Sequence, residues 1–183
     1  MSDSLKRVFF ALDLPKNIQD RISDIILDLN KNDNSVKWVD SANLHVTLHF
    51  ISDLDSLILG VLKKSMADWK SKGTARMKFG GLNAFPGPER PKIIFLKCEQ
   101  INGTSIHDLY AKIEKDLKEV GIKIDDRAWT PHITLGRVKN FYKLKSDEYE
   151  LADETFEIKT FSLIESKLNA NGPEYTIVET KNL

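Results

Sequence analysis

The stretch at residues 44–51, LHVTLHFI, alternates apolar and polar side chains from Leu44 to Phe50. Apolar side chains occupy the four even positions, and His45, Thr47 and His49 lie between them. Strict alternation over this length is typical of a strand with one buried face. We therefore predict a strand that buries its even positions in the core and presents two histidines and a threonine on its other face.

The first half of this strand has a counterpart later in the chain. The tetrapeptide at 45–48, HVTL, recurs at 132–135 as HITL, an offset of 132 − 45 = 87 residues in a chain of 183. Ordinary residue frequencies give such a match by chance roughly once in a few hundred pairs of histidines. The repeat therefore indicates either an internal duplication or a shared chemical demand, rather than coincidental patterning of two surface strands.

Periodicity along the rest of the chain predicts three helices among seven strands. The helices begin after Pro15, near Leu54 and at Ile106, where apolar residues recur at helical spacing. The predicted strands cover residues 7–14, 44–51, 75–84, 93–96, 130–138, 155–168 and 175–180. A strand-rich chain of this kind predicts an α+β fold, with helices covering one face of an antiparallel sheet.

Composition excludes several classes of protein. Lys and Arg number 27 and Asp and Glu number 27, so a strongly basic binder with a long nucleic-acid footprint is excluded, although an enzyme that grips one terminal phosphate is not. No apolar run approaches the ~18–20 residues of a membrane span. Cys98 is the single cysteine and cannot form an internal disulfide. Because no secretory signal opens the sequence, we expect a cytoplasmic protein.

Each tetrapeptide presents one imidazole and one hydroxyl side by side. Residues i and i+2 of a strand point to the same face, ~6–7 Å apart. Imidazole titrates near pH 6.5, so of two facing histidines one can be neutral and the other protonated, as a general base and a general acid require. Threonine hydroxyls can donate hydrogen bonds to phosphate oxygens. The pattern therefore favours acid–base chemistry at a phosphate.

A metal site is the alternative interpretation of the histidines. His45 and His49 have the i, i+4 spacing of helical zinc ligands, but on a strand they lie ~13 Å apart and cannot share one ion. His45 with His132 supplies only two of the usual three protein ligands. We therefore expect no metal, and we expect His49 and His107 to be surface or helix-cap residues.

Further stretches resemble the two-histidine (2H) phosphoesterases, in the branch of RNA 2′,3′-cyclic phosphodiesterases that are also called 2′-5′ RNA ligases. The resemblance covers nearly the whole chain, and two motifs at this separation make it specific where either alone would be weak. The matching segments are RVFFALDLP (7–15), WV (38–39), NLHVTLHF (43–50), FP (85–86), RP (90–91), PHITLGRV (131–138), ES (165–166) and GPEY (172–175).

The resemblance implies a fold and a reaction. It implies one two-lobed domain over residues 1–183, in which two pseudo-symmetric lobes of antiparallel sheet carry helices on their outer faces and enclose a central cleft. It implies hydrolysis of a terminal RNA 2′,3′-cyclic phosphate to a 2′-phosphate without a metal or other cofactor. Some members of the family also join 2′-5′ linkages in vitro.

The resemblance also implies roles for individual residues. His45 and His132 match the catalytic histidines, and Thr47 and Thr134 match the phosphate-binding hydroxyls. We hypothesise that His132 deprotonates the attacking water and that His45 protonates the departing 3′-oxygen, although the symmetry of the motifs does not fix this order.

Two more residues are predicted to contact the substrate. Arg137 matches a family arginine that contacts phosphate or nucleotide, but in a regular strand its side chain would lie on the opposite face from His132, unless Gly136 permits a bulge. Phe9 alternates with Val8 and Phe10 and is expected to stack on a nucleobase or to form a second layer of core.

Two other functions remain open at this point. The same fold and histidines suit a phosphodiesterase of small cyclic nucleotides, and they suit a non-catalytic nucleotide- or RNA-binding module. For partners we expect RNA with a terminal 2′,3′-cyclic phosphate or a nucleotide analogue, no membrane, and a monomeric protein.

Overall fold

The computed structural model describes residues 5–30, 35–69, 73–125, 127–144, 154–170 and 172–183. In chain order the elements are β1 (Lys6–Asp13), α1 (Lys16–Leu29), β2 (Val36–Trp38), the 3-10 turn η1 (Ser41–Asn43), β3 (His45–Leu54), α2 (Ser56–Asp68), β4 (Ala75–Phe85), β5 (Ile93–Gly103), α3 (Ile106–Glu119), β6 (His132–Val138), β7 (Thr155–Ile158), β8 (Thr160–Asn169) and β9 (Gly172–Asn182).

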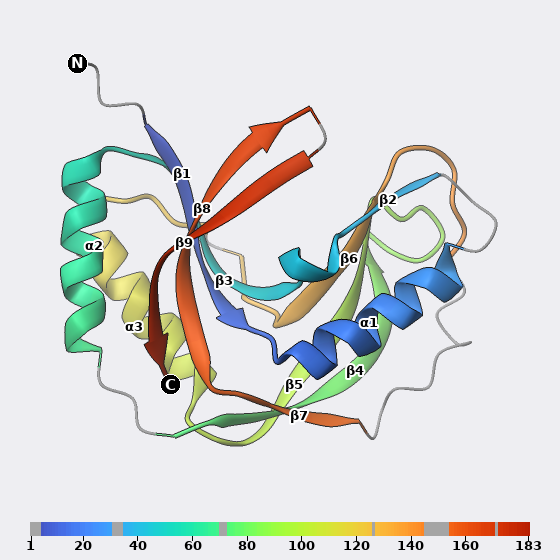
Figure 1. The fold of residues 1–183 in the computed structure, drawn as a ribbon, viewed down its shortest axis with the longest axis horizontal. Helices are drawn as coiled ribbons and strands as arrows, with labels where there is room; N and C mark the ends of the chain where they lie inside the picture. The colour runs from blue at the N-terminus through green and yellow to red at the C-terminus, as the bar shows by residue number, and fades with distance from the viewer. Residues whose placement is uncertain (1–4, 31–34, 70–72, 126, 145–153, 171) are drawn as a thin grey trace.

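These strands form one antiparallel sheet in the order β7-β4-β5-β6-β3-β1-β8-β9, with β2 paired to β6 (Figure 1). The α+β class and the three helices are as predicted. The predicted strand at 155–168 is divided into β7 and β8, which lie at different places in the sheet, and the short β2 was not predicted. No helix among the described residues is long and apolar enough to cross a membrane.

The sheet has two halves that meet at one residue pair. One half contains β1, β3, β8 and β9, and the other contains β2, β4, β5, β6 and β7. Between β3 and β6 the register joins only Val46 with Ile133. Both residues have equivalent neighbours in their own half, since Val46 pairs with Leu12 of β1 and Ile133 pairs with Leu96 of β5. The two tetrapeptides therefore occupy matching positions at the centre of the sheet.

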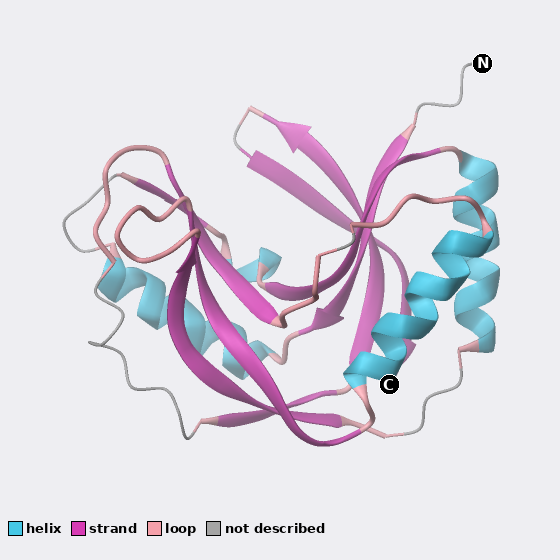
Figure 2. Cartoon of the chain, turned by 180° about the vertical axis from the view of Figure 1, so that it is seen from behind, coloured by secondary structure: helices cyan, strands magenta, loops and turns pink. Residues whose placement is uncertain are grey.

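The helices α1 and α3 each cross from one half of the sheet to the other (Figure 2). Each follows a strand of one half and packs against the other half. The helix α1 follows β1, and its Arg21 Nε donates to the carboxylate of Glu154, just before β7, at 3.2 Å. The helix α3 follows β5, and the Tyr110 ring stacks on His49 of β3 with ring centroids 3.9 Å apart. The helices therefore tie the two halves together across their narrow junction.

The main core lies between the sheet and the helices. Val46 and Ile133 are fully buried in it, together with Phe10 and Leu12 of β1. The opposite face of the sheet holds a separate small apolar cluster of Phe9, Ala11 and Ile164, with Tyr175 packed against it. This second face also carries the polar residues of both tetrapeptides, and we call it the motif face.

A bulge interrupts each motif strand at its leucine. In β3, Thr47 pairs with Ala11 and His49 with Phe10, so that Leu48 is an extra residue. In β6, Thr134 pairs with Phe95 and Gly136 with Ile94, so that Leu135 is the extra residue. An extra residue changes which face the following side chains occupy.

The bulge corrects the predicted orientation of His49 and Phe50. The alternating pattern placed His49 beside His45 on the polar face and Phe50 in the core. In the structure His49 is buried, with 3% of its surface exposed, and Phe50 is 61% exposed. Buried His49 bonds the Tyr110 carbonyl through Nε2 at 2.9 Å, so it is a core histidine and not a surface one. The alternation failed here because one inserted residue reverses every side chain after it.

Burial of His49 makes stability depend on pH. Burial lowers the pKa of His49 below its ordinary value of 6.5, so as pH falls through that value the unfolded chain takes up the proton more readily than the folded one. The free energy of unfolding should therefore fall on acidification below pH 6.5, by up to about 1.4 kcal/mol per pH unit for one histidine. The variant His49→Gln should show a weaker loss between pH 7.5 and 5 in denaturant titrations. An unchanged pH dependence would contradict this.

Gly136 is required by the close approach of β2. A Cβ on Gly136 would lie 2.6 Å from Val36 Cγ1 and 2.9 Å from Trp38 Cε3. We expect Gly136→Ala to lower the free energy of unfolding by about 1–3 kcal/mol, because β2 must move away. The control is Gly60→Ala in α2, where a Cβ meets nothing within 4 Å. Because alanine favours a helix more than glycine does, this change should raise the free energy of unfolding by about 0.5–1 kcal/mol. Thermal denaturation of both variants tests the contrast, and equal shifts would refute it.

Candidate active site

The single pairing between β3 and β6 brings the two tetrapeptides together. Because Val46 and Ile133 are opposite each other and both point into the core, their chain neighbours point to the motif face. The strands are antiparallel, so the histidine of each motif is directed toward the threonine of the other. All four motif side chains are partly buried.

Both imidazoles are held in the same way. His45 Nδ1 lies 2.7 Å from the carbonyl oxygen of Asn43, and His132 Nδ1 lies 2.7 Å from that of Thr130. A carbonyl oxygen can only accept, so Nδ1 carries the proton in each ring. The neutral tautomer of each ring therefore leaves Nε2 as the atom that can take up or release a proton.

The two Nε2 atoms have different surroundings. His45 Nε2 lies 3.0 Å from Thr47 Oγ1, and in the neutral ring this nitrogen accepts from the hydroxyl. Among the residues that the structure describes, none forms a hydrogen bond with His132 Nε2. The second histidine is therefore the one whose nitrogen is free to receive a proton from water.

Burial and a like charge lower the pKa of His45. Burial is the larger cause, and the positive charge of protonated His132 lowers the pKa further, while the Asn43 carbonyl opposes both. The two imidazoles are thus close enough to influence each other electrostatically. Because protonation of one ring disfavours protonation of the other, the state in which both rings are charged is disfavoured.

Aromatic rings support each imidazole. The His45 ring contacts Phe9 at 4.9 Å and Tyr175 at 5.6 Å between centroids. The His132 ring contacts Phe95 at 5.1 Å and Phe85 at 5.5 Å. Rings packed on two sides restrict the rotation of an imidazole, so both histidines are held in place before any ligand binds.

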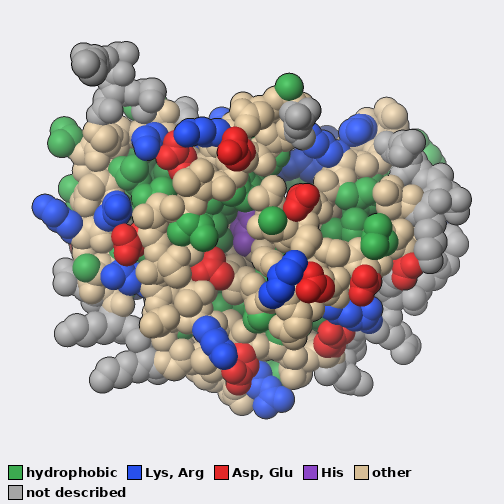
Figure 3. Space-filling view, in the orientation of Figure 1, with side chains coloured by type: hydrophobic (Ala, Val, Ile, Leu, Met, Phe, Trp, Pro, Cys, Tyr) green, Lys and Arg blue, Asp and Glu red, His purple; other side chains and the backbone are tan. Residues whose placement is uncertain are grey.

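Phe9 lies on the motif face in the small apolar cluster, and only 2% of its surface is exposed. His45, Tyr175 and Phe50 surround its ring, the last in a stacked arrangement at 6.2 Å. A direct contact between Phe9 and a ligand stays a prediction. Of the rings around Phe9, Phe50 is exposed and Tyr175 is partly exposed. Figure 3 shows histidine and hydrophobic side chains next to each other near the middle of this side of the molecule.

Arg137 is exposed and approaches the opposite half of the sheet. Burial raises the pKa of Tyr175, and the positive charge of Arg137 counteracts part of that rise. Tyr175 belongs to β9, whereas Arg137 lies on β6 after the bulge at Leu135. In a regular strand Arg137 would lie on the opposite face from His132. The bulge at Leu135 reverses the side chains after it, so Arg137 can approach the motif face. Its contact with a substrate stays a prediction.

Sequence reasoning missed two residues beside the motifs. Tyr175 contacts the His45 ring and was noticed only as part of the GPEY segment. Trp129, three residues before His132, donates its indole N–H to the Thr47 carbonyl at 2.9 Å and stacks on Tyr110 at 4.6 Å. Trp129 thus connects the segment leading into one motif with the backbone of the other. Only its proximity to the second motif could have drawn attention to it.

The indole hydrogen bond is testable with Trp129→Phe. This variant keeps a stacking ring but leaves the Thr47 carbonyl without its donor, which should cost about 1 kcal/mol of stability. The loosened β3 should admit water to His45, so its pKa should rise toward 6.5 in an NMR titration.

The matched control for this variant is Trp38→Phe. Trp38 donates its indole N–H to the exposed side chain of Asn30, away from His45. The control should therefore leave the His45 titration unchanged. Equal titrations of His45 in wild type and Trp129→Phe would show that this hydrogen bond does not hold the motif.

No group of three or more His, Cys, Asp or Glu side chains within the described ranges is arranged to hold a metal ion. The functional groups that the described residues bring to the motif face include two imidazoles, two hydroxyls and a nearby guanidinium.

Comparison with known proteins places this arrangement in context. A family model described as the 2′-5′ RNA ligase superfamily matches residues 14–169. A Methanothermobacter thermautotrophicus protein named RNA 2′,3′-cyclic phosphodiesterase is 30% identical over 184 residues, which cover 97% of this chain and 98% of the relative. A Methanocaldococcus jannaschii protein of the same name is 29% identical over 179 residues, covering 94% and 98%.

Solved structures share the fold. The protein TT0787 of Thermus thermophilus superposes with a TM-score of 0.83 at 24% identity, over 97% of both chains. Escherichia coli LigT complexed with 3′-AMP superposes with a TM-score of 0.79 at 19% identity, over 98% of both chains. At these identities the likeness establishes the architecture alone.

Proposed function

The chain belongs to the 2′-5′ RNA ligase superfamily, and we propose that within it this protein hydrolyses RNA 2′,3′-cyclic phosphate ends to 2′-phosphates. The observation that carries the proposal is the pair of imidazoles, both fixed through Nδ1 at 2.7 Å and both beside the Val46–Ile133 pair. The name shared by the relatives at 29–30% identity supports the choice of substrate.

The proposed reaction is one in-line displacement at phosphorus. His132 Nε2 takes a proton from water, whose oxygen forms a bond to phosphorus while the bond from phosphorus to the 3′-oxygen breaks. His45 gives its Nε2 proton to the departing 3′-oxygen. The products are a 2′-phosphate and a 3′-hydroxyl, and a proton exchanged with solvent restores both rings. The free Nε2 of His132 supports its role as base.

Because His45 is buried, its protonation in this proposal depends on the bound substrate. In the free site, burial and His132 lower the pKa of His45, so its protonated form is disfavoured. A phosphodiester anion bound beside the ring favours the protonated form. In this proposal His45 becomes a competent acid when the phosphate is in place, which limits proton transfer to the occupied site.

The remaining residues bind the substrate in this proposal. Thr47 and Thr134 donate hydroxyl hydrogen bonds to the non-bridging phosphate oxygens, and Arg137 neutralises the phosphate charge. Thr47 exchanges its bond to His45 Nε2 for one to the phosphate. The terminal nucleobase lies against Tyr175, which Phe9 supports from beneath at 5.0 Å.

The same groups would also serve a joining reaction. If a 5′-hydroxyl of a second RNA replaces water, His132 accepts its proton, the 3′-oxygen departs as before, and a 2′-5′ phosphodiester forms. In either direction one phosphorus–oxygen bond forms and another breaks, and the two imidazoles carry the accompanying protons, so the proposed route uses no metal.

Product analysis tests the proposal. An oligoribonucleotide ending in a 2′,3′-cyclic phosphate, incubated with the protein and a chelator, should yield a 2′-phosphate end. His45→Ala and His132→Ala should each lower kcat by a factor of about 10² or more, because each removes a proton-transfer group. Chromatography against 2′- and 3′-phosphate standards identifies the product.

The control is His49→Gln, which removes a histidine of the same strand from its core-facing side. Its kcat should stay near that of wild type at pH 7.5. A 3′-phosphate product, or undiminished turnover in either alanine variant, would overturn the mechanism. Binding without turnover would favour a non-catalytic RNA-binding module.

A further inference from the structure

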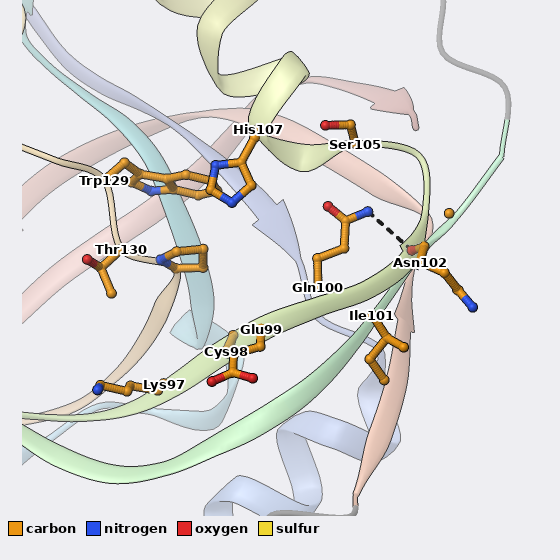
Figure 4. Close-up of a pocket in the computed structure, with 12 residues that line it drawn as sticks. Lys97, Cys98, Glu99, Gln100, Ile101, Asn102, Ser105, His107, Trp129 and Thr130 are labelled. Carbon is orange, nitrogen blue, oxygen red and sulfur yellow. Dashed lines mark hydrogen bonds between the residues drawn. The ribbon is translucent and has the colours of Figure 1, made fainter.

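A cavity of about 620 Å³ lies next to His132 along β5 (Figure 4). Its floor is the strand from Lys97 to Gly103, and its walls are His107 at the start of α3 and the segment from Trp129 to Pro131. We call this cavity the β5 groove. Its lining contains none of the residues that the proposed reaction uses, but it includes Pro131, which directly precedes His132.

Two contacts connect the groove with the catalytic histidine. Thr130, which lines the groove, is the residue whose carbonyl holds His132 Nδ1 at 2.7 Å. Lys97, at one end of the floor, is paired with His132 in the register of β5 and β6, so their side chains share the motif face. The groove therefore borders His132 on the side of its Nδ1, and Lys97 shares a face of the sheet with the imidazole.

The groove exists because β6 is shorter than β5 and begins only at His132, opposite Lys97. The register of β5 with β6 covers Ile93 to Lys97, and the last backbone bond runs from Cys98 N–H to the Pro131 carbonyl at 3.0 Å. Beyond that bond β5 continues to Gly103 and pairs only with β4 on its other side. This open stretch is about 20 Å long, since about six residues each advance ~3.3 Å. A stacked nucleic-acid strand advances ~3.4 Å per nucleotide, so the groove has room for more than one.

The side chains of the groove suit a single RNA strand. Lys97 has no hydrogen-bond or ion-pair partner within the described part of the chain, so its ammonium is available to a phosphate. In the other half, the residue paired with His45 is Asp13. Its carboxylate already accepts a hydrogen bond from the Ser162 hydroxyl at 2.8 Å. The one carboxylate of the groove, Glu99, is paired with Lys78 at 3.0 Å. Repulsion of a phosphate by this carboxylate is therefore reduced.

Two aromatic side chains form the wall of the groove next to α3. His107 and Trp129 meet edge to face with ring centroids 5.2 Å apart, and Figure 4 shows them together at this wall. Aromatic rings beside a backbone-binding cation are the usual elements of single-strand recognition, since any nucleobase can stack on them. A peptide added to the β5 edge would instead need pockets for alternate side chains.

We propose that the β5 groove binds the nucleotides immediately 5′ of the cyclic phosphate, so that the preferred substrate is an oligonucleotide end and not a mononucleotide. This inference rests on the proposed function. Lys97 contacts the phosphate that precedes the terminal nucleoside, and His107 with Trp129 supports the base before it.

The first test is the dependence of wild-type activity on substrate length. We compare kcat/KM for a nucleoside 2′,3′-cyclic phosphate with that for di-, tri- and tetranucleotides ending in the same nucleoside cyclic phosphate. The trinucleotide should exceed the mononucleotide by about fivefold or more, because one stacked base contributes at least that factor. Length-independent kcat/KM would overturn the groove proposal, leave the proposed function intact, and leave the β5 edge as a candidate for peptide binding.

The second test places a negative charge in the groove. His107→Glu should bring the ratio of trinucleotide to mononucleotide kcat/KM close to one, because the carboxylate repels the RNA backbone. The matched control is Leu57→Glu, since Leu57 is the second residue of α2 as His107 is of α3, and both are exposed. Glutamate is favourable in the first turn of either helix, so both variants should fold. An unchanged ratio in His107→Glu would overturn the proposal.

The third test concerns the cation. For a single strand, each neutralised phosphate contributes about −0.7 to the slope of log affinity against log salt concentration. Lys97→Met should therefore flatten the salt dependence of trinucleotide KM by about that amount, whereas Lys115→Ala on the exposed face of α3 should not. An identical slope in wild type and Lys97→Met would remove Lys97 from the proposal. Failure to turn over any of the cyclic phosphates would refute the proposed function instead.

Discussion

The site depends on one contact between strands, the pairing of Val46 with Ile133. Two apolar side chains that point into a shared core force their polar neighbours onto the opposite face, where both histidines and both threonines meet. Because the register of β3 with β6 contains this pair alone, the other connections between the two halves come from other elements. The helices α1 and α3 pack across the junction, and Trp129 binds the Thr47 carbonyl from the segment before β6.

The two halves provide the same geometry but different environments. Each Nδ1 is held by a carbonyl two residues earlier, so both rings expose Nε2. His45 lies deeper, between Phe9 and Tyr175, and burial lowers its pKa. Unequal burial gives two chemically identical side chains different affinities for a proton, since desolvation disfavours the charged form of the imidazole.

The bulges at Leu48 and Leu135 allow the motif strands to serve two purposes. Before the bulge, each strand alternates between core and motif face. After it, His49 points into the core under α3, and Arg137 reaches toward Tyr175 of the opposite half. Gly136 makes the second bulge compatible with β2, because any side chain there would collide with Val36 and Trp38.

Local patterns in the chain were enough to predict the α+β class, the three helices and the two repeated tetrapeptides with their histidines and threonines on one face, because alternation and chemistry are local properties. They misplaced His49 and Phe50, since a bulge depends on the partner strand and leaves no mark in the alternation. They also left the surroundings of the motifs unassigned. Trp129, Tyr175 and Lys97 are far from the first motif in sequence, and only the antiparallel pairing of distant strands brings them to the histidines. These contacts follow from the tertiary structure, because sheet register joins residues that no local pattern connects.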